Sequence, residues 1–205
     1  MRRTARQDAP GAFGRLIAPL IAFCQPSISP GTQLFHGMRD GMGSFEPSRY
    51  GQMMRIALYQ PDIAGNVGTI LRLAACWQIP VDIILPCGFP ASDAQLRRAA
   101  MDYGGHVDVT RHVDFAAFVE TRLIGSARLV ALTSAGETTL FNASFLPDDI
   151  LMMGRESAGL PVEIREMTAQ RVRIPMAAGF RSLNVAVASG IALGEALRQT
   201  GSFPQ

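Results

Sequence analysis

The sequence contains no lysine and only three cysteines. All nineteen basic residues among the 205 are arginine, whose planar guanidinium suits phosphate groups and base edges, although a GC-rich gene produces the same bias. Cys24, Cys76 and Cys87 are widely spaced and form no C-x-x-C pair. The cysteines therefore indicate neither a disulfide framework nor a zinc site, and they fit a reducing compartment. We expect a cytoplasmic protein that requires no metal.

Long apolar runs are also missing. No stretch of eighteen consecutive apolar residues occurs, which argues against a membrane-spanning helix, so we expect no membrane partner. The formal net charge of +2 is too small to predict a nucleic-acid partner by itself. Hydrophobic residues make up 48% of the chain and charged residues 18%, which is typical of an ordinary globular protein.

Several common active-site motifs are absent. The chain has neither a G-x-G-x-x-G fingerprint nor a P-loop pattern, which leaves a dinucleotide or nucleoside triphosphate site poorly supported. The segment "GRESAGLP", from Gly154 to Pro161, places its serine in the order G-x-x-S-x-G instead of the hydrolase order G-x-S-x-G. A hydrolase using Ser157 would also need a histidine base, for which His106 and His112 are candidates. The alternative is that this loop holds a ligand.

The first 53 residues differ in composition from the rest. They are rich in glycine and proline and lack a sustained period, so they cannot bury enough apolar surface to offset the entropy lost on ordering. We expect residues 1–53 to be either a flexible extension or the product of an upstream misreading of the start codon. Residues 54–205 are expected to form one domain.

From Met54 onward, short apolar segments alternate with helical patterns. This alternation predicts an α/β fold with a mostly parallel sheet flanked by helices, in which ligands bind at the carboxyl ends of the strands. The expected strands are 54–59, 81–85, 107–110, 128–133, 150–153 and 171–175. The expected helices lie near 65–78, 92–102, 113–124, 161–168 and 184–199.

The segment "QPDIAGNVGTILRLAACW", residues 60–77, predicts an amphipathic helix with Asn66 as its N-cap. Arg72 lies on a different stripe from the apolar residues. Helical side chains lean toward the N-terminus, so its guanidinium can reach back to backbone donors that favour an anion. The alternative is a solvated surface arginine.

The last segment predicts a small-residue helix after a loop. A strand ends at Pro175, and a loop leads to Asn184, which begins a helix containing repeated alanine, serine and glycine. Small side chains allow another backbone to approach closely. The helix is therefore expected either to pack tightly inside the domain or to form a helix–helix dimer interface.

Three spaced motifs give a resemblance to a known family. In order, they are N-x-G-x-x-x-R (residues 66–72), G-x-E-x-x-G (154–159) and S-L-N-V-x-V-A (182–188). Together they resemble the three motifs of the SpoU branch of the SPOUT RNA methyltransferases, across about residues 54–200. The block "LRRAAMDY" (96–103) and the lack of an added RNA-binding domain look most like the minimal subgroup, which methylates the wobble nucleotide of leucine tRNAs.

The resemblance implies a fold, a cofactor and a reaction. It implies a C-terminal trefoil knot, a homodimer, and transfer of a methyl group from S-adenosylmethionine to the 2'-hydroxyl of a cytidine or uridine ribose in tRNA. The implied cofactor-binding residues are Leu132, Gly154, Ile174 and Ser182. The implied catalytic residues are Arg72, Asn66 and Asn184. Alternatives within this class are another tRNA position or ribosomal RNA, and a non-catalytic RNA-binding module is a further alternative.

The resemblance leaves open how the motif arginine acts. The family's arginine is proposed as a base, yet an arginine is effectively always protonated, so we expect Arg72 to hold a phosphate and to stabilise the developing alkoxide. Arg97 and Arg98 are candidates for RNA contacts or for a solvated helix face. This chain departs from the subgroup at three positions, which are Arg155 for proline, Ala186 for serine and Gly194 for tyrosine.

Overall fold

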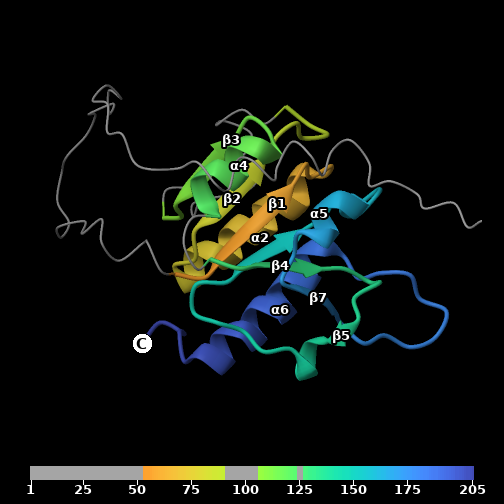
Figure 1. Ribbon diagram of the computed structural model, residues 1–205. Coiled ribbons are helices and arrows are strands. Elements are labelled where there is room, and N and C mark those ends of the chain that lie inside the picture. Colours follow the sequence, from red (N-terminus) through yellow and green to blue (C-terminus); the bar gives the residue numbers. More distant parts are fainter. Residues whose placement is uncertain (1–52, 91–105, 124–126) are drawn as a thin grey trace, which may run out of the picture. The chain divides into compact units, whose positions relative to one another are not determined.

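Figure 1 shows the computed structural model of the protein, in which residues 53–90, 106–123 and 127–205 are described. Three predictions lie outside the described residues. They concern the expected extension up to residue 52, the expected helix at 92–102 with Arg97 and Arg98, and the "LRRAAMDY" block.

One parallel sheet organises the described residues. Its seven strands run in the order β3-β2-β1-β6-β4-β7-β5, and each pair of neighbours is parallel. The predicted α/β class and mostly parallel sheet are therefore confirmed. The strands are β1 (Arg55–Tyr59), β2 (Val81–Ile84), β3 (Val109–His112), β4 (Leu129–Leu132), β5 (Thr138–Thr139), β6 (Ile150–Met153) and β7 (Gln170–Arg173).

Helices cover both faces of this sheet. Helices α2 (Ala64–Trp77) and α6 (Val185–Thr200) contribute buried side chains to one core. Helices α4 (Phe115–Arg122) and α5 (Val162–Glu166) contribute to the core on the opposite face. The sheet is therefore the middle layer of three.

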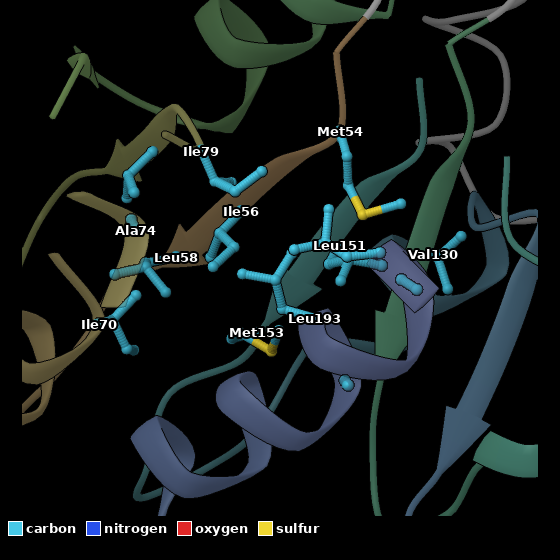
Figure 2. Close-up of a cluster of buried hydrophobic side chains, with 14 of the residues drawn as sticks. Met54, Ile56, Leu58, Ile70, Ala74, Ile79, Val130, Leu151, Met153 and Leu193 are labelled. Atoms are coloured by element: carbon cyan, nitrogen blue, oxygen red, sulfur yellow. The ribbon is translucent and has the colours of Figure 1, made fainter. Parts of the chain in front are cut away.

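The two cores follow from the period-two alternation of the central strands. In β1, Ile56 and Leu58 enter the core beneath α2 and α6, which Figure 2 shows, whereas Ala57 enters the opposite core. In β6, Leu151 and Met153 again face α2 and α6. Each large apolar side chain buried in this way contributes about 1.5–3 kcal/mol.

Local signals define where two helices begin and end. The Asp114 carboxylate accepts a hydrogen bond of 2.8 Å from the backbone N–H of Ala117 and so caps α4. Asn184 caps α6, as the sequence predicted for the start of that helix. Helix α6 ends at Thr200, and the φ of 62° at the next residue, Gly201, is left-handed and suits glycine.

Most predicted elements lie within two residues of their expected bounds, but several differ. The strand expected to end at Pro175 is β7, which ends at Arg173. The strand expected at 107–110 is β3, two residues later, because His112 at its end is buried and hydrogen-bonded despite being polar. Strand β5 and the 3₁₀ turn at Leu140–Asn142 were not predicted, since such short elements have too few residues to produce a period. In the described ranges no helix is both long and apolar enough to cross a membrane.

Candidate cofactor pocket

A pocket of about 640 Å³ lies at the carboxyl ends of β4, β6 and β7. This volume falls within the roughly 300–1,000 Å³ of small-molecule sites. The residues that line it come from segments as far apart in the sequence as Ile63 and Ala188. Six of the seven predicted site residues line the pocket, namely Asn66, Leu132, Gly154, Ile174, Ser182 and Asn184.

The seventh predicted residue, Arg72, is placed differently. It is exposed on α2 and is not among the residues that line the pocket. Six residues separate it from Asn66, which corresponds to about 9 Å along the helix axis. The role predicted for Arg72 therefore depends on where the RNA lies relative to the exposed side of α2.

Hydrogen bonds join the three sequence motifs at the pocket wall. Glu156 Oε1 accepts from Asn66 Nδ2 at 2.9 Å, and Asn184 Nδ2 donates to Asn66 Oδ1 at 2.9 Å. The other Glu156 oxygen accepts from the backbone N–H of Asp62 at 2.7 Å. Glu156 therefore accepts from one backbone N–H and one side-chain amide. One side chain from each motif therefore takes part in a single network.

Asn66 was predicted as the N-cap of its helix, and this prediction is wrong. Helix α2 begins at Ala64, and its cap residue is Ile63, whose side chain makes no capping bond. The amide of Asn66 instead bonds to Glu156 and Asn184. A polar residue near the start of a helix looks like a cap in sequence, but here tertiary partners use its side chain.

The loop after β6 makes a very close turn. The backbones of Arg155 and Gly159 exchange two hydrogen bonds, of 3.1 and 2.8 Å. A Cβ added to Gly154 would overlap the backbone of Gly159, and Gly159 itself has a φ of 70°. Both glycines are therefore required for the backbone to line the pocket in this way.

Asp62 holds this loop from the side of α2. Arg155 donates to Asp62 Oδ1 from Nη2 at 2.7 Å, and Ser157 donates to Asp62 Oδ2 from its hydroxyl at 2.6 Å and its backbone N–H at 3.0 Å. These bonds, first that from the Arg155 side chain and then those from Ser157, lower the pKa of Asp62 to about 2. Arg155, which stands where the subgroup has proline, therefore forms an ion pair with Asp62.

Ser157 is not arranged as a hydrolase nucleophile. Its hydroxyl donates to a carboxylate, and a carboxylate held at a pKa of about 2 is a weak base. Of the two histidines considered as its base, His112 is buried and bonded to Asp82 and Thr121, and His106 is exposed. The geometry favours the alternative in which the "GRESAGLP" loop holds a ligand.

The small residues of α6 face α2. A Cβ on Gly190 or Gly194 would lie 3.6 Å from Leu73 or 3.7 Å from Trp77, respectively. This is the packing inside the domain that was one of the two alternatives for this helix. Next to these glycines on α6, an apolar stripe is exposed, with Val187 52% accessible.

Sequence reasoning missed two charged residues near the pocket. Asp62 sits in a polar loop before α2, where a carboxylate has no periodic signal. Arg165, on α5, lines the pocket, but in sequence it is indistinguishable from a solvated helix residue. Only the fold places either of them next to the three motifs.

Comparisons with known proteins agree with the motifs. The SpoU rRNA Methylase family matches residues 53–194. A tRNA (cytidine(34)-2'-O)-methyltransferase of Beijerinckia indica subsp. indica is 50% identical over 148 residues, which cover 72% of this chain and 92% of that protein. A solved structure from work on the 2-OH methylation of C/U34 on tRNA is 43% identical with a TM-score of 0.68, and the match covers 73% of this chain and 97% of that one.

An AdoMet-bound rRNA methyltransferase from Sinorhizobium meliloti is similar as well. It is 30% identical with a TM-score of 0.65, and the match covers 71% of this chain and 56% of that one. The family match extends over all three motifs and over every residue that was assigned to the pocket from sequence. The chain therefore belongs to the SpoU rRNA methylase family.

Proposed function

We propose that this protein transfers a methyl group from S-adenosylmethionine to the ribose 2'-hydroxyl of the wobble cytidine or uridine of tRNA. The observation that carries the proposal is the junction of all three motifs at one pocket. Relatives named tRNA (cytidine(34)-2'-O)-methyltransferase align with nearly their whole length to this chain. The solved structure concerned with C/U34 of tRNA is likewise covered at 97%.

The pocket suits S-adenosylmethionine in size and lining. Gly154 permits the close turn against Gly159 because no Cβ fits there, and Leu132 and Ile174 add apolar surface to the pocket. These residues and Ser182 would hold the cofactor, which supplies a methyl group activated by its sulfonium.

The asparagines act by holding the pocket in shape. Asn184 joins the start of α6 to Asn66, and Asn66 joins α2 to Glu156 on the loop after β6. Accurate placement of the 2'-oxygen in line with the methyl group depends on these three segments keeping their positions. Arg72, on the exposed side of α2, holds a tRNA phosphate and stabilises charge on the attacking oxygen.

Further proposals concern assembly, location and substrate. An exposed apolar stripe runs from the loop before α6 along that helix and consists of Leu183, Val187 and Ile191. This stripe supports a homodimer. The cysteine pattern supports a cytoplasmic location. The resemblance in the motifs underlies two more proposals, which are a C-terminal trefoil knot and a preference for leucine tRNAs.

The test of the proposed function is nucleoside mass spectrometry of tRNA from a strain that lacks the gene. The strain is rescued with the wild-type protein, with Arg72→Ala, or with Arg198→Ala as a control for loss of one exposed arginine. We expect 2'-O-methylcytidine or 2'-O-methyluridine at the wobble position of leucine tRNA to disappear on deletion and to return with wild type and Arg198→Ala.

The Arg72→Ala variant separates two questions. A return of less than about a tenth of the methylation, as expected for loss of one group that stabilises charge in the transition state, supports the role given to Arg72. Full rescue contradicts that role but leaves the substrate assignment intact. Unchanged tRNA methylation on deletion contradicts the substrate, and ribosomal RNA becomes the next molecule to analyse.

A further inference from the structure

Arg165 is half-buried, and one atom of its guanidinium has an unusual environment. Its side chain reaches the pocket from α5, and its Nε atom is buried without any hydrogen-bond partner. Across the described ranges it is the one buried side-chain nitrogen or oxygen in this condition. The fully buried carboxylates of Asp82 and Asp149, in contrast, have hydrogen-bond partners on both oxygens.

An unpaired buried donor is costly. Leaving a buried N–H without an acceptor costs about 1–3 kcal/mol, and more for a charged group. The exception needs a physical reason. Because Arg165 also lines the pocket, its guanidinium can take an acceptor that enters there.

The pocket itself holds no spare carboxylate for Arg165 among its described lining residues. Glu156 is the acidic residue in the lining, and both of its oxygens already accept hydrogen bonds. The neighbouring carboxylate of Asp62 is bound by Arg155 and Ser157. An acceptor for Arg165 is therefore expected from a ligand.

We propose that Arg165 binds the carboxylate of S-adenosylmethionine. The proposal rests on the proposed function, because it takes this cofactor as the occupant of the pocket. The carboxylate is the single anionic group of the cofactor, whereas its ammonium and sulfonium groups are repelled by a guanidinium. The planar fork of an arginine also matches a carboxylate in two parallel hydrogen bonds.

The contact gives the pocket a way to discriminate among adenosine compounds. Residues such as Leu132 and Ile174 supply apolar surface that any adenosine compound can use. A contact to the carboxylate rewards only ligands that carry the amino-acid end. Arg165 thus selects S-adenosylmethionine and S-adenosylhomocysteine over 5'-methylthioadenosine, which lacks that end.

The experiment is isothermal titration calorimetry with two ligands on the full chain. S-Adenosylhomocysteine carries the carboxylate and 5'-methylthioadenosine does not. Arg165→Met keeps much of the side-chain length while removing its charge, Arg165→Lys keeps the charge, and Arg171→Met is the control, since Arg171 pairs with Glu137 outside the pocket lining. Thermal melting of each variant establishes that it is folded.

We expect Arg165→Met to weaken S-adenosylhomocysteine binding about tenfold, as for loss of one charge-assisted hydrogen bond, and to change 5'-methylthioadenosine binding less than twofold. Arg165→Lys should recover part of the loss, and Arg171→Met should match wild type. Equal weakening of both ligands, or no weakening of either, overturns the proposal. If Arg165→Met fails to fold, the test uses the ratio of the two ligand affinities in wild type and in Arg165→Lys. Equal affinity of the wild-type protein for both ligands overturns the proposal.

Two other outcomes are distinguishable. If the wild-type protein binds neither ligand, the cofactor assignment in the proposed function fails. If Arg165→Met leaves both ligands unchanged but lowers the salt dependence of tRNA binding by about one phosphate contact, the residue binds RNA phosphate and the carboxylate assignment is overturned.

Discussion

Two carboxylate-centred clusters in this molecule differ in burial and in what they connect. One surrounds Asp82, which is 0% exposed. The other surrounds Asp62 and Glu156 at the pocket, where the Asp62 side chain is 18% exposed. The first joins β1, β2, β3 and α4, and the second joins the loops that carry the three motifs.

The Asp82 cluster has its partners packed within the protein. Arg55, His112 and Arg122 bond its two oxygens at 2.8 to 2.9 Å. Burial alone raises the pKa of Asp82, but the hydrogen bond and charge of Arg55, followed by His112 and Arg122, hold it below its usual value. The arrangement is complete without a ligand, whereas the pocket retains the unpaired Nε of Arg165. The comparison suggests that the first cluster serves stability and the second serves binding.

The largest effect is expected from Asp82→Ala. The change leaves the nearly buried guanidinium of Arg55 and the partly buried one of Arg122 without their carboxylate. Breaking a buried pair in this way typically costs about 3–5 kcal/mol. Urea denaturation followed by circular dichroism measures the loss, with exposed Asp108→Ala as control. A loss under about 1 kcal/mol would contradict the structural role given to this cluster.

Glu156→Ala is expected to act on the reaction more than on stability. It removes the acceptor for Asn66 and for the backbone N–H of Asp62, at a cost of about 1 kcal/mol. Displacement of the loops by about 1 Å can reduce methyl transfer about 100-fold. The measurement is the rate of methyl transfer to tRNA, with exposed Glu163→Ala as control. A normal rate for Glu156→Ala would show that the three motifs do not need this network.

Asp62→Asn should have the smallest effect, and it should depend on pH. The folded pKa of Asp62, about 2, lies below the usual value near 4, so its charge stabilises the fold above pH 4 and loses this effect as the pH falls from 4 toward 2. A partly exposed pair is worth about 1 kcal/mol or less. Melting temperatures of wild type and variant should differ at pH 7 and converge near pH 2. A difference that stays constant down to pH 2 would contradict the pairing with Arg155.

The fold class and the family were predictable because their signals are spread along the chain. Strands such as Ile150–Met153 are fully buried and read as continuous apolar runs, which is typical of a parallel sheet covered on both faces. The motif residues, such as Gly154, are required by backbone geometry that other residue types cannot provide. These features leave a pattern in the sequence.

The contacts of individual polar groups were less predictable. Asn66 was taken for a helix cap because residue type and position carry no information about Glu156, ninety residues away. Arg165 has no sequence signal, since its unpaired Nε results from the packing around α5 and the pocket. Long-range partners depend on the strand order, and the sequence pattern does not specify that order.

The hydrogen-bonded asparagines have a definite direction. A carboxylate only accepts, so Asn66 must turn its NH₂ toward Glu156 and its oxygen toward Asn184. Asn184 must then turn its own NH₂ toward Asn66 and its oxygen toward the N–H groups of Ala186 and Val187. The amide dipoles therefore align head to tail and polarise one another. Through this polarisation, the Glu156 carboxylate strengthens the hydrogen bonds at the first turn of α6, a helix that it does not need to touch.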